Sequence, residues 1–220
     1  GRHSGVPLEC RGGLARINPD SDRLEYYGAT KRAHPNRDQI ARTLRLAPAK
    51  IDLFEGNVGG GFGIRGELYP EDFIICAAAL RFKRPIRWIE DRREHLLTAN
   101  QSRQQTHKAR AAIDKDGRIL GIDNEFFHDQ GGYLRTHGVR VPDMTAGLML
   151  GPYKVPSYRV AGRVRLTNKT PAATYRAPGR YEGTFVRERL MDAVAVRVGI
   201  DPIEVRRRNL LSADAMPYSR

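Results

Sequence analysis

The sequence predicts an α+β fold, with mixed sheets and packed helices in one domain over residues 1–212. Strand-like and helix-like stretches are interspersed along the 220 residues without an internal repeat or a low-complexity linker. In addition, 40% of the residues are hydrophobic, which is enough for a core. Residues 213–220 show neither pattern and are expected to form a flexible tail. No apolar run reaches the roughly 18 residues of a membrane-spanning helix, so no membrane association is expected.

The first quarter of the chain is expected to hold two strands, a helix and a third strand. Residues 13–29 are typical of a strand–turn–strand unit, because Asn18–Asp20 supplies turn residues. Residues 34–48 are typical of a short helix that Pro48 ends. One face of this helix carries the apolar residues Ile40, Ala41 and Leu44. Residues 50–58 predict a strand that leads into a glycine-rich loop.

The middle of the chain predicts a helix followed by several strands. A helix is expected over residues 70–82, since proline suits its first position and acidic residues favour its first turn. Its residues are apolar on nearly every side, which predicts a helix buried all round. Residues 84–91 predict a strand. Residues 107–127 predict a hairpin that turns at Asp116-Gly117, and residues 153–168 predict a further extended stretch.

Two helices are expected near the C-terminus. Residues 182–199 carry apolar side chains at helical spacing, and Gly199 is a natural stop. Residues 201–211 predict a second helix, capped by Asp201 and completed by Glu204 in a capping box.

The formal net charge of +13 raises the possibility of nucleic-acid binding. However, the arginines are spread along the chain, so no nucleic-acid partner is expected. The two cysteines, Cys10 and Cys76, lack the spacing of a metal site, and a disulfide between them is not expected. A reducing, cytoplasmic location follows. The six histidines show no ligand spacing either, so no residue is expected to bind a metal directly.

Residues 55–72, with the sequence EGNVGGGFGIRGELYPED, concentrate glycine between a strand and a helix. The run could be a tight structural loop. It could be a dinucleotide fingerprint, because Gly61–Gly66 matches G-x-G-x-x-G and an acidic residue ends the next strand, although the helix starts later than that motif requires. It could also be a backbone cradle for a larger ligand, from which Phe62 alone projects a side chain.

A cradle of this kind needs a second element to close the site. The candidate is residues 170–180, with the sequence TPAATYRAPGR, which present Arg176 and Arg180. An arginine there can donate two parallel hydrogen bonds to a phosphate or an oxyanion. A surface turn with solvated arginines is the alternative.

Five motifs in order resemble the molybdenum-binding subunit of the molybdenum hydroxylases, the family of xanthine dehydrogenase, aldehyde oxidase and carbon monoxide dehydrogenase. They cover residues 2–12, 58–72, 83–95, 173–180 and 201–211. The resemblance implies the first molybdopterin-binding domain of a xanthine dehydrogenase-like subunit. It implies oxidation of an aldehyde or an N-heterocycle with oxygen from water. It also implies a molybdenum–molybdopterin cofactor, for which a cytosine dinucleotide form is one option, and 2Fe–2S clusters and FAD on partner subunits.

The resemblance also implies roles for individual residues. The cofactor would be approached by Gly60, Gly61, Phe62, Gly63, Tyr175 and Arg176. Arg176 would be catalytic, since a fixed donor beside a reacting oxygen stabilises developing negative charge. The substrate pocket would be lined by Lys31, Glu67, Ala177 and Pro178.

Three positions depart from the pattern of the family. Lys31 stands where many members have a glutamine near the metal. Gly66, followed by Glu67, stands where xanthine-oxidising members have a glutamate, so purine recognition is not expected. Ala177 stands where the carbon monoxide enzymes have a cysteine, so that activity is not expected either.

The general-base glutamate of the family lies several hundred residues beyond Arg220. We therefore expect a C-terminal half of the subunit to complete the site, and we expect these residues alone neither to hold the cofactor tightly nor to turn over. The excess positive charge would then face the missing domains. Two alternatives stay open: a noncatalytic interaction module of the same fold, and an NAD-binding domain that uses Gly61–Gly66.

Overall fold

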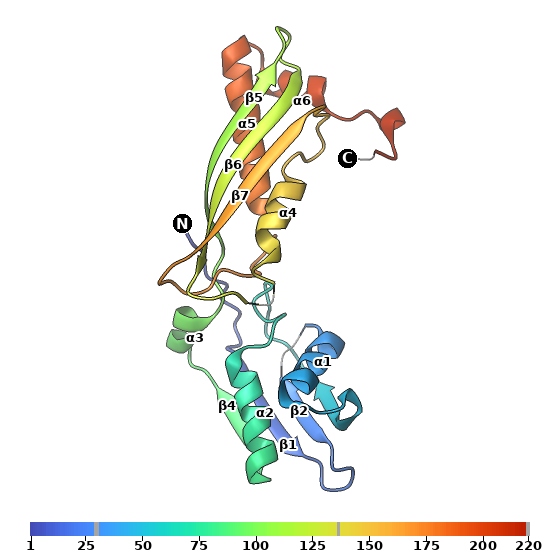
Figure 1. Cartoon of the computed structure of the whole chain (residues 1–220), viewed down its shortest axis with the longest axis vertical. Helices are drawn as coiled ribbons and strands as arrows, with labels where there is room; N and C mark the ends of the chain where they lie inside the picture. The colour runs from blue at the N-terminus through green and yellow to red at the C-terminus, as the bar shows by residue number, and fades with distance from the viewer. Residues whose placement is uncertain (29–30, 136, 219–220) are drawn as a thin grey trace. The chain divides into compact units, whose positions relative to one another are not determined.

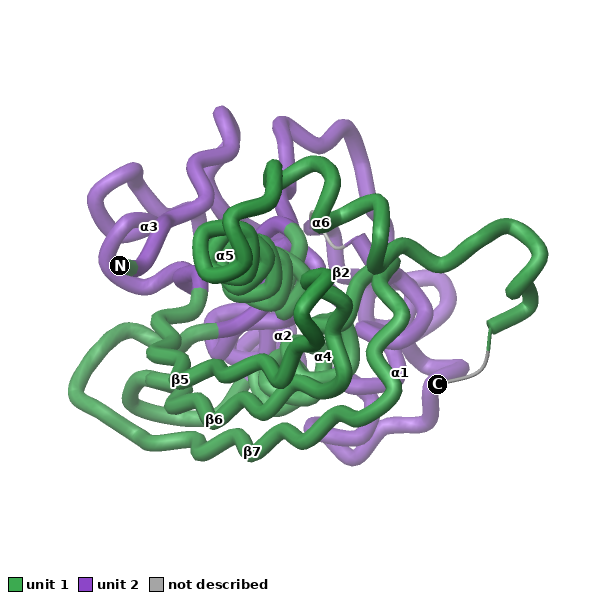
Figure 2. Tube along the Cα trace, turned by 90° about the horizontal axis from the view of Figure 1, so that it is seen from above, with its two compact units in different colours: residues 1, 103–172, 177–220 green, residues 2–102, 173–176 purple. Residues whose placement is uncertain are grey.

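The computed structural model describes residues 1–28, 31–135 and 137–218. The chain divides into two compact units, which Figure 2 shows in different colours. Unit 2 contains residues 2–102 and 173–176, and unit 1 contains residues 103–172 and 177–220 together with Gly1. Both units combine strands with helices (Figure 1), which confirms the predicted α+β class. No linker-like stretch of the sequence marks this division.

Unit 2 is built on a four-stranded mixed sheet with the order β3-β2-β1-β4. Its strands are β1 (Gly12–Ile17), β2 (Leu24–Gly28), β3 (Ile51–Phe54) and β4 (Ile86–Ile89). β1 pairs antiparallel with β2 and β4, whereas β2 and β3 are parallel. The turn between β1 and β2 forms as predicted, because the Asn18 side chain accepts hydrogen bonds from two backbone N–H groups of the turn.

The helical elements of unit 2 are α1 (Ala33–Leu44), the 3₁₀ helix η1 (Pro48–Lys50), α2 (Pro70–Phe82) and α3 (Arg92–Thr98). The prediction that Pro48 ends α1 is wrong. The helix ends at Leu44 because Arg45 adopts a left-handed conformation with φ of 57°, and Pro48 begins η1. α3 was not predicted from the sequence. Its signal was a capping box, in which Asp91 and Glu94 each accept the backbone N–H of the other.

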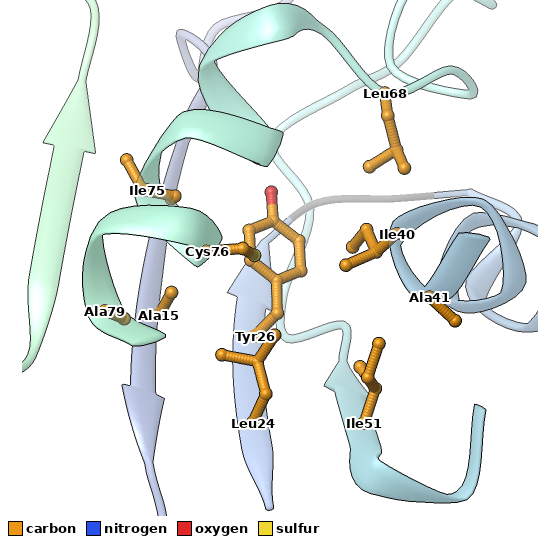
Figure 3. Close-up of a cluster of buried hydrophobic side chains, with 10 residues drawn as sticks. All are labelled: Ala15, Leu24, Tyr26, Ile40, Ala41, Ile51, Leu68, Ile75, Cys76 and Ala79. Atoms are coloured by element: carbon orange, nitrogen blue, oxygen red, sulfur yellow. The ribbon is translucent and has the colours of Figure 1, made fainter. Parts of the chain in front are cut away.

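The core of unit 2 lies between the sheet and helices α1 and α2. Figure 3 shows its buried side chains gathered around Tyr26: Ala15, Leu24, Ile40, Ala41, Ile51, Leu68, Ile75, Cys76 and Ala79. The Tyr26 hydroxyl donates to Asp72 over 2.6 Å. Burial raises the pKa of Tyr26 and that of Asp72. The expectation that α2 is buried all round is wrong, since Ile74 is 63% exposed and Phe82 is 64% exposed. Only one face of the helix packs on the sheet.

Unit 1 contains a three-stranded sheet with the order β5-β6-β7. β5 (Gln104–Ile113) and β6 (Ile119–Gly131) form the predicted antiparallel hairpin, and β7 (Tyr158–Leu166) pairs parallel with β6. Its helical elements are α4 (Arg140–Leu148), α5 (Arg180–Val198), α6 (Pro202–Asn209) and the 3₁₀ helix η2 (Ala213–Ala215).

The predicted helix ends of unit 1 are largely confirmed. α5 ends at Val198, and Gly199, which has φ of 69°, is its C-cap. Asp201 caps α6 by accepting two backbone N–H groups. Glu204 does not complete a capping box, because its carboxylate accepts from Arg208 instead. Within the described parts of both units, no helix is long and apolar enough to cross a bilayer.

Candidate functional site

The glycine loop, residues 59–66, links β3 to α2 within unit 2. Most of its glycines are explained by the protein itself. Gly60 and Gly63 have φ of 103° and 93°, values that side-chain-bearing residues rarely adopt. A Cβ atom at Gly59 would lie 2.5 Å from the Cβ of Glu9, which is too close for both atoms to stay in place.

Gly61 differs from its neighbours. Its φ lies outside the left-handed region. Among the described residues other than Gly61 and its two chain neighbours, no atom lies within 4 Å of where its Cβ would be. Neither backbone strain nor packing inside the chain requires glycine at this position. A ligand that approaches the backbone from outside would require it, because any side chain would fill the space beside the peptide. This open face is therefore what a cofactor cradle needs.

The second loop predicted from the sequence meets the glycine loop at Phe62. The Arg176 N–H donates to the Phe62 carbonyl oxygen over 2.8 Å, and both residues belong to unit 2. Phe62 and Arg176 have φ of 50° and 24°, which is uncommon for residues other than glycine. Strained backbone of this kind is held in place by its surroundings and clusters at functional sites. The Phe62 side chain is 49% exposed, and Arg176 is exposed.

Close packing reinforces this junction. A Cβ atom at Gly63 would lie 2.8 Å from Cγ2 of Thr174, so the two loops are in contact there as well. A Cβ atom at Gly5 would lie 3.1 Å from the ring of Tyr175 and 3.1 Å from Ile64. Three segments distant in sequence, around residues 5, 63 and 175, therefore pack together.

Glu9 closes the glycine loop at both ends. Its Oε2 atom accepts the Gly59 N–H over 2.7 Å and Nη1 of Arg65 over 2.8 Å. The Arg65 side chain is only 4% exposed, so the guanidinium is buried against its carboxylate partner. Sequence reasoning missed this clamp. The available signal was Arg65 itself, which a dinucleotide-binding turn does not require.

The geometry does not fit the dinucleotide interpretation. α2 begins at Pro70, after the glycines have ended, and its first turn holds the carboxylates of Glu71 and Asp72. Asp72 accepts the Tyr69 N–H over 2.7 Å, so a side chain of the protein already caps the helix. Moreover, β3 and β4 are not neighbours in the sheet, whereas the fingerprint belongs to a βαβ unit of a parallel sheet.

The remaining predicted pocket residues have different surroundings. Lys31 is exposed, its N–H donates to the Arg65 carbonyl over 3.3 Å, and its side chain lies beside Gly66. Glu67 is buried, with 4% of its surface exposed. Ala177 and Pro178 follow Arg176 in the chain but belong to unit 1.

Two further features bear on the site. Within the described residues, no group of three or more histidine, cysteine, aspartate or glutamate side chains could hold a metal ion. A cavity of about 450 Å³ lies in unit 2, and its walls include Tyr27, Phe54 and Glu9. Tyr27 and Phe54 stack there with ring centroids 4.7 Å apart. Of the residues that line this cavity, Glu9 contacts the glycine loop.

Comparison with known proteins identifies relatives that are much longer than this chain. It is 43% identical over 218 residues to the gamma subunit of the 6-hydroxypseudooxynicotine dehydrogenase complex of Paenarthrobacter nicotinovorans, covering 99% of this chain and 27% of that protein. It is 31% identical over 214 residues to the nicotine 6-hydroxylase large subunit of the same organism, covering 96% of this chain and 26% of that protein. The chain thus spans about a quarter of the length of these curated relatives.

The fold is similarly matched by solved structures. Quinoline 2-oxidoreductase from Pseudomonas putida 86 superposes with a TM-score of 0.93 at 34% identity, over 100% of this chain and 28% of that one. The family described as "Molybdopterin cofactor-binding domain" matches residues 1–210. The chain therefore belongs to the molybdopterin cofactor-binding domain family, as its sequence motifs indicated.

Proposed function

We propose that this chain is the first molybdopterin-binding part of a molybdenum hydroxylase subunit, which oxidises an N-heterocycle or an aldehyde with oxygen from water. The observation that carries the proposal is the open face of Gly61, next to the strained junction of Phe62 with Arg176. This face is a place where a ligand can reach the backbone without meeting a side chain.

The residues that would hold the cofactor come from the two loops. The peptide groups of Gly60–Gly63 would approach it, and Tyr175 and Arg176 would border it. When bound, the molybdenum–molybdopterin group supplies the two-electron redox chemistry. The chain would supply position and charge: the Arg176 guanidinium would donate hydrogen bonds to an oxygen on which negative charge develops. The exposed ring of Phe62 would shield that side of the site from water.

Among the possible substrates we favour an aromatic N-heterocycle. The relatives named for nicotine and quinoline chemistry share 31% and 34% identity with this chain, whereas the carbon monoxide dehydrogenase large chain of Hydrogenophaga pseudoflava shares 27%. Ala177 in place of a cysteine argues against carbon monoxide oxidation, and Gly66 argues against purine recognition. Lys31, exposed beside Gly66, would add positive charge to the pocket and favour a substrate that carries a hydroxyl or carboxylate group.

Partners follow from the names of the relatives, which are a gamma subunit and a large subunit. We propose that iron–sulfur and flavin subunits take up the electrons and that a further part of the molybdenum subunit completes the site. The cytosine dinucleotide form of the cofactor and a cytoplasmic location belong to the same proposal. Residues 1–220 alone are expected to show no turnover.

The experiment compares Gly61→Val with Gly56→Val in the intact protein that carries this chain. Gly56 is the matched control. Its φ is not left-handed, and no described residue other than its chain neighbours has an atom within 4 Å of its would-be Cβ, but it lies outside the glycine loop. Molybdenum content is measured by mass spectrometry, and dye reduction is measured with quinoline, nicotine or an aldehyde. Gly61→Val is expected to lose molybdenum and activity, whereas Gly56→Val is expected to keep both. The melting temperature of the cofactor-free protein should be the same in both variants, since bound cofactor itself stabilises the folded state.

A Gly61→Val protein that fills with molybdenum as the parent does would contradict the cradle. A parent protein that takes up no molybdenum and oxidises none of these compounds would instead favour a noncatalytic interaction module.

A further inference from the structure

A cluster of charged residues lies buried in unit 2, outside the two loops. At its centre is His95 of α3, whose side chain is 0% exposed. Its Nδ1 atom lies 2.6 Å from Oε1 of Glu90, and its Nε2 atom lies 2.8 Å from the carbonyl oxygen of Gly5. Both ring nitrogens therefore face oxygen atoms at hydrogen-bond distance.

A neutral imidazole has a single N–H, so it can donate to only one of these oxygens. The Gly5 carbonyl can only accept. Glu90 could donate only if it were protonated, but its carboxylate is already occupied by Arg11. Oε2 accepts Nε and Nη2 of Arg11 over 2.9 and 2.6 Å, and Oε1 accepts the Arg11 backbone N–H over 2.8 Å. With His95 included, each oxygen of Glu90 accepts two hydrogen bonds, which leaves no place for a proton.

The surrounding charges do not oppose a cationic ring. Nη1 of Arg11 also lies 3.6 Å from Glu71, and Asp72 interacts electrostatically with Arg11, so with Glu90 three carboxyl groups surround this arginine. An imidazolium at His95 adds a second cation beside Glu90. Burial alone would lower the pKa of Arg11, but the hydrogen bond to Glu90 raises it above its ordinary value. The aromatic ring of Tyr69 stacks against the Arg11 guanidinium, 3.7 Å from its carbon.

His95 is connected to the glycine loop through residues 3–11, which we call the N-terminal strap. On one side, α3 holds carbonyl groups of the strap: His95 binds that of Gly5, and Arg92 binds those of Pro7 and Leu8 over 2.5 and 2.9 Å. On the other side, Glu9 of the strap clamps the glycine loop. Between these contacts, Gly5 packs against Tyr175.

We infer that His95 is held as a doubly protonated imidazolium, and that it is a positioning residue for the glycine loop and Tyr175 because it anchors the N-terminal strap at Gly5. The ring does not touch the loop; it acts through the strap. A fixed strap keeps the backbone of the cradle in one conformation before a ligand arrives. Only the cofactor measurement below rests on the proposed function.

Neutron diffraction from deuterated crystals of the intact protein tests the protonation state directly. Deuterium is expected on both ring nitrogens of His95 and on neither oxygen of Glu90. A single deuterium on the ring, or one on Glu90, would overturn the assignment. This measurement uses the parent protein and is therefore independent of whether any variant folds.

The positioning role is tested by His95→Gln, with His34→Gln as the matched control. His34 is an exposed histidine of α1 in the same unit. A glutamine can donate toward only one of the two oxygens and presents its own oxygen to the other. His95→Gln is expected to raise hydrogen exchange at the Gly59 and Arg176 amides and to lower molybdenum retention roughly tenfold, as losses around bound metals commonly do. His34→Gln should change neither.

Unchanged exchange at both amides in His95→Gln would contradict the positioning role, even if the ring carries two protons. Altered exchange in a protein whose parent binds no molybdenum would uphold that role and reject the proposed function. The two failures are thus distinguishable.

Discussion

The glycine loop of unit 2 and the hairpin turn of unit 1, residues 114–118, both use glycine at positive φ, yet they are held in different ways. In the hairpin turn, the Asp114 side chain accepts the N–H groups of Asp116 and Arg118, and side chains of α6 donate to two carbonyl oxygens of the turn. In the glycine loop, the partners come from far along the chain. Glu9 is 50 residues from Gly59, and Arg176 comes from the second loop. The turn therefore has hydrogen bonds to its own Asp114 side chain in addition to the contacts from α6, whereas Glu9 and Arg176 reach the glycine loop from distant parts of the chain.

This comparison shows which glycine the protein's own structure explains and which one it does not. Gly117 of the hairpin turn has φ of 76°, so its own backbone conformation requires it. Gly61 has no positive φ, and in the part of the chain that the structure describes only its own chain neighbours lie within 4 Å of its would-be Cβ. Substitutions in the loop should therefore affect ligand binding and turnover, and substitutions in the hairpin should affect stability alone. The predictions at Arg176 and Gly117 test this separation directly. The predictions at Glu9 and Asp123 test how charged pairs stabilise each unit, and all four run from the largest expected effect to the smallest.

Arg176→Ala in the intact protein is expected to lower turnover by roughly 10²–10³-fold, the usual effect of removing a donor that stabilises developing charge. The melting temperature should barely change, because the side chain is exposed and the backbone bond from the Arg176 N–H to Phe62 remains. Arg180→Ala, an exposed arginine four residues later, is the control and should keep its activity. If turnover and stability fell together, Arg176 would be a structural arginine.

Glu9→Gln is expected to destabilise the protein by about 1.5–3 kcal/mol, since a hydrogen bond to a charged group is lost and the buried Arg65 keeps no carboxylate. Denaturant unfolding measures this loss, and faster hydrogen exchange at the Gly59 amide locates it in the loop. Glu55→Gln, at an exposed glutamate close to the loop, should leave both unchanged. Equal effects of the two substitutions would mean that Glu9 does not clamp the loop.

Gly117→Ala is expected to lower the free energy of unfolding by about 1–2 kcal/mol, because an alanine must adopt the left-handed conformation of this turn. Molybdenum content should stay at the parent level. Gly147→Ala within α4 is the opposite control, because outside its own helix backbone no described atom lies within 4 Å of its would-be Cβ. This substitution should stabilise the protein by roughly 0.5–1 kcal/mol. Loss of molybdenum in Gly117→Ala would contradict the claim that substitutions in the hairpin turn affect stability alone.

The smallest effect is expected at Asp123 on β6. Hydrogen bonds from Arg159, and then from Arg110, hold the pKa of this carboxyl below its ordinary value. Because the pKa is lower in the folded state, the stabilisation is complete above the pKa of the unfolded carboxyl, about 4, and is lost as the pH falls through the folded value. Asp123→Asn should remove this acid-dependent part. The difference from the parent should shrink in high salt, since the pair is exposed.

Much of the fold was predictable because its signals are local. Pro70 with its acidic neighbours fixed α2 at the bounds the structure has, and Gly199 marked the end of α5. The hairpin turn was also predictable, because Asp116-Gly117 is a local turn signal. α3 was missed although the pair Asp91 and Glu94 is a capping box in the sequence. α4 was missed because Pro142 near its start weakens the helical pattern.

The contacts that shape the candidate site were mostly not predictable from sequence. Nothing local pairs Glu9 with Arg65, or His95 with Gly5, because these pairs form only when distant segments fold together. The exposed face of α2 was also unforeseen, since apolar composition does not tell how many neighbours a helix has. The glycine loop and Arg176 could be named from their motifs, but the bond between their backbones could not.

The central claim is that residue 61 is glycine because a bound cofactor occupies the space that a side chain would fill. A crystal structure of the intact protein purified with its cofactor tests this most directly, through the distance from the Gly61 Cα to the nearest cofactor atom. The account predicts van der Waals contact between the Gly61 Cα and a cofactor atom, at about 4 Å. It also predicts that the Arg176 guanidinium contacts the same cofactor. A cofactor bound elsewhere, with only solvent beside Gly61, would contradict it.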